Sequence, residues 1–287
     1  MRVGGMLRSA RGWDSTSDRL VLMGTTFVAL EDRRMPLRIV VLTYPCAKTL
    51  RLLSSLAESG LAIAAVLLQQ SSLSRRIARL VRGLGILDTL TIAMQRLNTE
   101  LSARPECNPH RAGAYRVGGC RVIKVRDLDS NEVVALLRQL DPDIGVIGCA
   151  GILRPEVFHA FRIGVLNIHP GQTPQYRGRS PLEWTILEDA QPGVTLHFVD
   201  SGVDTGPVVQ QLEVPVEAGD DFESLYGRVY DVGIRLLVSS LERLQQVGSL
   251  GLLSQNWRGS HLRYSMPRRL RRAAQRRLHE RASTNRD

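Results

Sequence analysis

Short apolar segments alternate with helical segments along most of this chain. The apolar segments span residues 37–43, 62–69, 121–125, 144–148, 164–169, 194–199 and 207–214, and helical stretches at 49–59, 130–140, 181–189 and 221–247 lie between or after them. Such alternation predicts a mostly parallel sheet covered by helices on both faces. We therefore predict an α/β fold with a doubly wound sheet in a single main domain at residues 35–250. We also expect a mainly helical segment at 72–98 and a loop at 102–119.

The segment before this domain, residues 1–34, shows no clear periodic core. Its apolar run from Leu20 to Leu30 is shorter than the roughly 20 residues that a membrane span needs. Glu31-Asp32-Arg33-Arg34 follows this run, where a signal peptide has small residues before its cleavage site. We expect an extension that is either disordered or not translated, a domain that begins at Met35, and a cytoplasmic protein.

The four cysteines, Cys46, Cys107, Cys120 and Cys149, show neither C-x-x-C spacing nor the density of a small disulfide-rich scaffold. This pattern favours neither a metal site nor a disulfide framework. It fits a reducing compartment.

The net charge of +10 is concentrated in the tail that we assign to residues 251–287. Residues 258–281 contain nine arginines and one acid, so the rest of the chain is close to neutral and does not favour a nucleic-acid partner. Leu270, Ala273, Ala274 and Leu278 fall on one helical face among these arginines. Such a helix either rests on an anionic membrane or an acidic partner, or packs lightly on the domain. The second interpretation is favoured because these side chains bury little apolar area.

Two segments predict an active site. Leu166-Asn167-Ile168-His169-Pro170-Gly171 ends a short apolar run, and Asp200-Ser201-Gly202-Val203-Asp204-Thr205-Gly206 follows a second one. Because side chains alternate along a strand, Asn167 and His169 lie on one face at the carboxyl end, where open α/β sheets bind ligands. Asp204 lies in a glycine-bracketed loop that is well placed to orient the imidazole. Taken singly, the histidine fits a structural role and the aspartate fits a turn.

Their joint occurrence with Pro174-Gln175-Tyr176-Arg177-Gly178 and Gly193–Val199 is more specific. From about Pro142 to Val214 the chain resembles the formyltransferases that use 10-formyltetrahydrofolate. That family acts on methionyl-tRNA, glycinamide ribonucleotide or amino sugars. The resemblance implies a Rossmann-like fold, 10-formyltetrahydrofolate as co-substrate, a small-molecule amine as acceptor, and no metal. It also implies a catalytic trio at Asn167, His169 and Asp204.

The resemblance also implies roles for these residues. The Asn167 amide and a protonated His169 donate to the oxyanion of a tetrahedral intermediate, and Asp204 favours the imidazolium and assists proton transfer. The folate slot falls on Gly151, Ile152 and Leu153, although an ordinary strand-to-helix turn fits that segment equally well. Further cofactor-binding positions are His197, which fits a core histidine about as well, and Asp200. Tyr176 and Arg177 either contact an anionic acceptor or pack the loop.

Departures from the family pattern bear on the acceptor. Gly171-Gln172-Thr173-Pro174 is more polar than the usual loop, and Thr43-Tyr44-Pro45-Cys46-Ala47 replaces a glycine-rich phosphate loop. Only 83 residues follow Asp204, which we judge too few for the β-barrel of the tRNA enzyme. These departures favour an amino sugar nucleotide or another specialised primary amine. A 10-formyltetrahydrofolate hydrolase, a methionyl-tRNA formyltransferase-like enzyme, a dehydrogenase and a noncatalytic binding protein stay open as alternatives, and the sequence does not indicate an oligomeric state.

Overall fold

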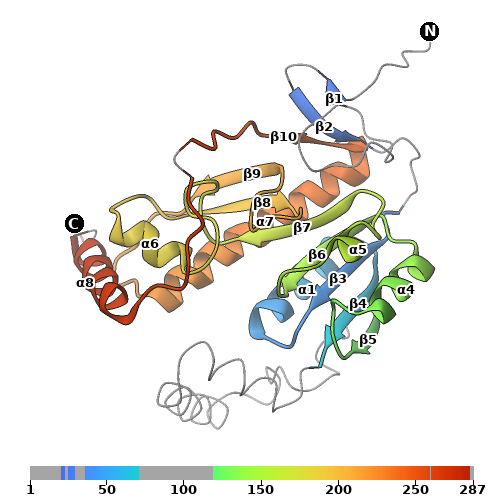
Figure 1. Ribbon diagram of the computed structural model, residues 1–287, viewed down its shortest axis with the longest axis horizontal. Coiled ribbons are helices and arrows are strands. Elements are labelled where there is room, and N and C mark those ends of the chain that lie inside the picture. Colours follow the sequence, from blue (N-terminus) through green and yellow to red (C-terminus); the bar gives the residue numbers. More distant parts are fainter. Residues whose placement is uncertain (1–20, 23–24, 30–35, 71–118, 259, 285–287) are drawn as a thin grey trace.

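A seven-stranded sheet forms the centre of the molecule (Figure 1). The computed structural model describes residues 21–22, 25–29, 36–70, 119–258 and 260–284. The strand order is β5-β4-β3-β6-β7-β8-β9; the strands are parallel from β5 to β7, and β8 and β9 are antiparallel to their neighbours. Their bounds are β3 (Ile39–Thr43), β4 (Ile63–Gln69), β5 (Arg121–Val125), β6 (Ile144–Cys149), β7 (Gly164–His169), β8 (Gly193–Phe198) and β9 (Val208–Glu213). The predicted α/β fold with a mostly parallel sheet is confirmed.

Helices cover both faces of this sheet because its strands are apolar on both sides. Ile39 and Val41 of β3 join a core that includes α1 (Ala47–Glu58) and α7 (Phe222–Val247). Val40 and Leu42 point to the other face, where α4 (Asn131–Leu140) and α5 (Pro155–Phe158) pack. A short helix, α6 (Pro181–Leu187), packs into the core on the α7 side.

Local sequence signals set where these helices begin and end. The Ser130 hydroxyl accepts a hydrogen bond from the Val133 N–H at the start of α4. Asp221 and Ser224 form a capping box at the start of α7, and Gly248 ends that helix with a φ of 79°. The predicted helices and strands from 37 to 247 lie within about two residues of those observed. The predicted helical segment 72–98 and nearly all of the predicted loop 102–119 lie outside the described residues.

The strand order reverses between β3 and β6. From β3 the chain adds β4 and β5 on one side, and then returns to add β6 and β7 on the other. The carboxyl ends of the strands beside such a switch point form the usual ligand crevice of an open α/β sheet. We therefore expect a ligand site among the segments that follow β3, β6 and β7.

A second, smaller sheet joins segments from both ends of the domain. Within it, β2 (Thr25–Ala29) pairs with β1 (Val21–Leu22) and, over four residues, with β10 (Ser249–Leu252). Part of the extension that we expected to be disordered thus forms strands, and these lie within its apolar run. The domain boundary at Met35 stays a prediction.

The basic tail ends in a helix, α8 (Arg268–Thr284), which lies beside α6 (Figure 1). Its buried side chains are Ala274, Leu278 and Ala282, spaced four residues apart, whereas Leu270 is 36% exposed. The predicted apolar face was therefore wrong at Leu270, because the face in contact with the domain lies one turn further along. Since that face is buried, it is not free to meet a membrane, and the packed-helix interpretation is favoured. Among the described helices, none has the length and apolar character that crossing a bilayer requires.

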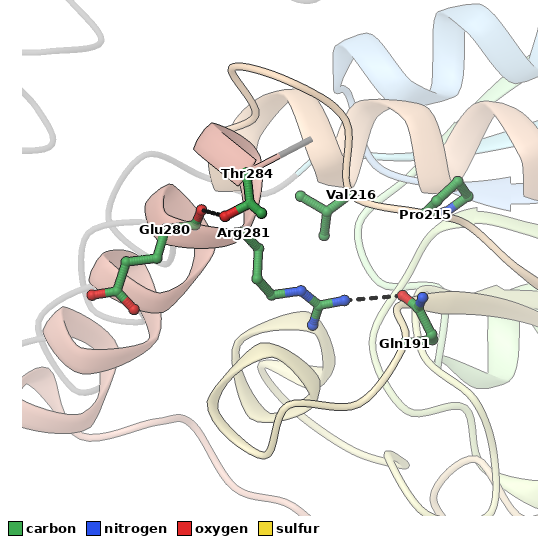
Figure 2. A pocket seen from close by; sticks show the side chains of 6 residues that line it. All are labelled: Gln191, Pro215, Val216, Glu280, Arg281 and Thr284. Carbon is green, nitrogen blue, oxygen red and sulfur yellow. Dashed lines mark hydrogen bonds between the residues drawn. The ribbon is translucent and has the colours of Figure 1, made fainter. Parts of the chain in front are cut away.

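Arginines of α8 also hold it to the domain. The Arg281 guanidinium donates to the Ala190 carbonyl (2.8 Å) and to Gln191 Oε1 (3.0 Å), and Arg277 donates to the Leu187 carbonyl. A hollow of about 340 Å³ lies beside these contacts, lined by Gln191, Pro215, Val216, Glu280, Arg281 and Thr284 (Figure 2). It contains none of the predicted site residues. Arg277 and Arg281 thus donate hydrogen bonds to backbone carbonyl groups of the domain.

Candidate active site

Strand β7 presents Asn167 and His169 on the face that points away from α7. Leu166 and Ile168, which alternate with them along the strand, are buried in the core on the α7 side. Gly233 permits this packing, since a Cβ there would lie 2.3 Å from Ile168 Cγ2. Close contact between α7 and β7 therefore fixes the strand, and the strand's alternation fixes where Asn167 and His169 point.

The antiparallel partner strand β8 adds a second histidine to the same face. His197 pairs directly with Asn167 across the two strands, and Thr195 pairs with His169. Asn167 Nδ2 lies 3.2 Å from His197 Nε2, and His197 Nδ1 lies 2.8 Å from the Phe198 carbonyl oxygen. A carbonyl oxygen only accepts, so Nδ1 carries the hydrogen, and in a neutral ring Nε2 accepts from the Asn167 amide. His197 thereby orients the Asn167 side chain.

Asp204 lies opposite both imidazoles. Its Oδ2 is 3.4 Å from His169 Nδ1, and its Oδ1 is 3.6 Å from His197 Nε2. The backbone holds it there with a φ of 51°, a left-handed conformation that aspartate tolerates better than most residues. The structure thus brings together Asn167, His169 and Asp204, the three residues predicted to form the trio.

A glycine in the neighbouring loop fixes the Asp204 carboxylate. The Gly178 N–H donates to Asp204 Oδ2 (2.9 Å). Gly178 has a φ of 100°, and a Cβ there would lie 2.3 Å from the Arg263 carbonyl oxygen. Only glycine fits this position, since both its backbone conformation and its close approach to Arg263 exclude a side chain.

Burial and charge set the protonation of this cluster. Burial lowers the pKa of His169, and it outweighs the opposing effects of the Asp204 carboxylate and the Tyr176 carbonyl. For Asp204, burial alone raises the pKa, but the charge of His169 and the Gly178 N–H help to lower it to about 2. Asp204 is therefore ionised at neutral pH, and His169 is neutral. In the resting site, burial of the ring thus outweighs its carboxylate partner, and the protonated His169 expected at the oxyanion stays a prediction.

A buried hydroxyl holds the loop that follows β7. Thr195 Oγ1 donates to the Gly171 carbonyl (2.7 Å) and accepts from the Thr173 N–H (3.1 Å). Gln211 on β9 donates to both the Thr173 carbonyl (2.9 Å) and Thr195 Oγ1 (2.8 Å). His169 Nε2 meets the same loop at the Tyr176 carbonyl, 2.8 Å away. The network fixes the loop against the strands that carry the trio.

The segment after β10 braces this loop from outside, a contribution that the sequence did not reveal. Gln255 donates to Thr173 Oγ1 (2.8 Å), and Ser260 Oγ donates to the Pro174 carbonyl (2.7 Å). The Arg263 N–H donates to the Arg177 carbonyl (3.0 Å), beside Gly178. The residues concerned are about 80 positions apart in the chain and form no local motif. The first part of the expected tail is therefore part of the site's support.

The remaining residues that we predicted to bind the cofactor lie in two segments, one after β6 and one after β8. Gly151 and Ile152 lie on the surface after β6, where Ile152 is 77% exposed, whereas Leu153 is buried. Asp200 Oδ1 accepts hydrogen bonds from the Gly202 N–H (3.0 Å) and the Thr205 hydroxyl (2.6 Å). The Asp200 side chain therefore closes its own loop.

The contacts of Arg177 and Tyr176 indicate that these side chains pack the loop, the second of the two roles that we considered for them. The Arg177 guanidinium donates to the Val203 carbonyl (3.3 Å) and to Ser260 Oγ (3.2 Å). The Tyr176 ring lies 5.8 Å from the Arg263 guanidinium. Both side chains join the loop to neighbouring segments.

Comparison with known proteins shows a family match and two relatives that share part of this sequence. A family model described as formyl transferase matches residues 95–241, just over half of the chain. The methionyl-tRNA formyltransferase of Burkholderia vietnamiensis (strain G4 / LMG 22486) is 36% identical over 124 residues, which cover 42% of this chain and 38% of that protein. That of Syntrophus aciditrophicus (strain SB) is 32% identical over 112 residues, covering 38% and 36%. The chain thus spans less than two fifths of the length of these two relatives.

Solved structures share the fold. The phosphoribosylglycinamide formyltransferase from Streptococcus pneumoniae TIGR4 superposes with a TM-score of 0.50 at 21% identity, covering 72% of this chain and 98% of that one. Glycinamide ribonucleotide transformylase 1 from Symbiobacterium toebii gives a TM-score of 0.52 at 20% identity, covering 74% and 88%. At these identities the likeness concerns the architecture alone.

Proposed function

Because this chain belongs to the formyl transferase family, we propose that it transfers a formyl group from 10-formyltetrahydrofolate to a primary amine. The observation that carries the proposal is the convergence of Asn167, His169 and Asp204 at the carboxyl end of β7. The ionised Asp204 carboxylate lies 3.4 Å from the ring of the neutral, buried His169. A carboxylate beside a neutral imidazole is suited to accept and return a proton during acyl transfer.

Asn167 supplies a donor for the oxyanion. Its amide has two N–H bonds, and one of them donates to His197 Nε2. Within the part of the chain that the structure describes, the second N–H has no partner, and we propose that it donates to the formyl oxygen as that oxygen becomes anionic in the tetrahedral intermediate. His197 is a positioning residue in this proposal, because it holds the Asn167 amide in place and does not itself contact the reacting atoms.

In this proposal, His169 transfers the proton of the attacking amine. Because His169 Nε2 meets the Tyr176 carbonyl, Nε2 carries the hydrogen of the neutral ring and Nδ1, which faces Asp204, is the basic nitrogen. Nδ1 takes the proton that the attacking amine loses, and Asp204 stabilises the imidazolium that forms. The proton then passes to the departing folate nitrogen. In the resting site, His169 Nε2 is engaged with the Tyr176 carbonyl, so contact with the formyl group through this atom requires that bond to be exchanged for one to the substrate.

The folate lies against the loop after β6 in this proposal. The pterin needs an apolar surface and backbone groups, and Ile152 presents its side chain to solvent one strand away from the trio. Among the described residues, the backbone of Gly151 and Ile152 makes no hydrogen bond. Those groups suit the donors and acceptors on the edge of a pterin. Asp200 contributes by closing the loop that carries Asp204.

The acceptor that we propose is an amino sugar nucleotide or another small primary amine. The chain between β3 and α1, Tyr44-Pro45-Cys46, lacks the glycine-rich turn that exposes backbone N–H groups to a ribonucleotide phosphate. Methionyl-tRNA is the second candidate because the two curated relatives above carry that name and activity.

Turnover with separate acceptors tests these assignments. The purified chain is incubated with 10-formyltetrahydrofolate alone, with a panel of amino sugar nucleotides, and with methionyl-tRNA. Release of tetrahydrofolate is followed together with the mass of the acceptor. Formyl gain on a sugar amine supports the proposal, and gain only on methionyl-tRNA selects the second candidate. Tetrahydrofolate release without an amine indicates a hydrolase, and no release in any mixture refutes the catalytic assignment.

A further inference from the structure

Two cysteines meet at the point where the strand order reverses. Cys46 immediately precedes α1 in the segment that follows β3, and Cys149 is the last residue of β6. Their sulfur atoms are 3.0 Å apart, although 103 positions separate the two residues in the chain. Both residues are partly exposed and carry free thiols. The pair thus lies where reagents entering the crevice at the strand ends can reach it.

Buried hydroxyl groups hold both cysteines in place. Thr49 Oγ1 lies 3.2 Å from Cys46 Sγ and 2.6 Å from Thr43 Oγ1, and Thr43 Oγ1 accepts from the Cys149 N–H (3.1 Å). The Tyr44 N–H donates to the Cys149 carbonyl (2.8 Å). Thr43 and Thr49 are fully buried. A disulfide has an S–S distance of about 2.05 Å, so closing this pair needs a sulfur movement of only about 1 Å.

The two thiols have different environments. The hydrogen bond between the two sulfur atoms outweighs burial and, with contacts to Thr49 and the Lys48 N–H, lowers the pKa of Cys46 to about 6. The same hydrogen bond and burial raise the pKa of Cys149. The position of Cys46 at the start of α1 agrees with this asymmetry, because the N-terminal end of a helix favours a thiolate. Cys46 is therefore the nucleophile of the pair.

We propose that Cys46 and Cys149 form a redox site that a peroxide converts to a disulfide. The Cys46 thiolate attacks one peroxide oxygen, so an S–O bond forms, the O–O bond breaks, and the released oxygen takes up a proton. This step leaves a sulfenic acid on Cys46. Cys149 then attacks the Cys46 sulfur; its proton joins the departing hydroxide, which leaves as water as the S–S bond forms. The peroxide takes two electrons from the two thiols, and none of the trio takes part.

Peroxide titration of the full chain tests the assignment. The protein is treated with hydrogen peroxide, quenched with an alkylating reagent under denaturing conditions and mapped by peptide mass spectrometry. We expect two of the four cysteines to lose reactivity, a peptide cross-linked through Cys46 and Cys149, and full recovery on reduction. Retention of four reactive thiols, or a cross-link through Cys107 or Cys120, overturns the proposal.

Single variants assign the two roles. Cys149→Ser should stop at a sulfenic acid on Cys46 that dimedone traps. Cys46→Ser should slow peroxide consumption by more than about tenfold, because an ordinary thiol is only a few per cent ionised at neutral pH. Cys120→Ser is the matched control and should behave like the unmodified chain. Equal rates in Cys46→Ser and the control overturn the roles, and the cross-link map of the unmodified chain stays decisive if a variant fails to fold.

Discussion

Replacing Asp204 by asparagine should reduce stability at neutral pH and leave it nearly unchanged in acid. The pKa of Asp204 falls from an ordinary value of 3.8 to about 2 in the folded state. A depressed carboxylate pKa contributes stability that is present above the unfolded value and is lost as pH falls through the folded value. At about 1.4 kcal/mol per pKa unit, the free energy of unfolding includes about 2 kcal/mol from this ionisation at pH 7. The Asp204 side chain is only 16% exposed, so solvent screens this contribution little.

The assay is chemical denaturation of the unmodified chain and Asp204→Asn at several pH values between about 7 and 2. Asparagine keeps the shape of the side chain, accepts from the Gly178 N–H, and tolerates the left-handed backbone at this position. The difference in unfolding free energy should be about 2 kcal/mol at neutral pH and should shrink toward zero as the pH falls from about 4 to about 2. Other acidic groups titrate in both proteins and cancel in the difference. A difference that is the same at both ends of this range refutes the electrostatic reasoning.

Two further variants identify the source of this stability. In a His169→Ala background the pH-dependent part of the Asp204→Asn penalty should shrink. The imidazole, which is charged in the acid range where Asp204 titrates, is the largest of the contributions that lower the carboxylate pKa. Asp231→Asn is the control, since Asp231 forms an exposed ion pair with Arg51. Surface pairs of that kind contribute about 1 kcal/mol or less. A control variant that reproduces the pH-dependent loss shows that general surface charge, and not the site, is responsible.

Four other outcomes follow from the structure. His169→Ala should lower formyl-transfer turnover by at least about a hundredfold with an unchanged circular dichroism spectrum, and near-native turnover contradicts its role. The His169 ring should titrate below the ordinary value of 6.5 in an NMR pH series, because burial disfavours its charged form. A chain that begins at Met35 should fold and bind folate as well as the full chain, although it loses the strand paired with β10, and a fall in folate affinity shows that the extension supports the site. The full chain should not sediment with anionic liposomes at low salt, since the apolar face of α8 is buried, and sedimentation that is lost on deletion from Met266 onward contradicts this.

The sequence predicted those parts of the site that depend on local periodicity. Asn167 and His169 lie two residues apart on an apolar strand, so their common face follows from strand geometry alone. The strand carrying His197 was also predicted, but its direction relative to β7 was not, because alternation along one strand carries no information about its neighbour. The antiparallel register decides that His197 pairs with Asn167 and not with His169. Placing the second imidazole therefore required the assembled sheet.

The support and the charge of the site depend on contacts between distant parts of the chain. The Asp204 carboxylate is fixed by Gly178, and Gly178 is fixed in turn by the backbone of Arg263, so three segments must meet before the carboxylate has a position. The protonation of His169 follows from the same assembly. A carboxylate partner alone predicts an imidazolium, but enclosing the ring among the strands and the loop reverses the balance. A neutral base beside an ionised Asp204 is thus a property of the completed fold, and in the mechanism that we propose it lets His169 accept the proton that the amine releases.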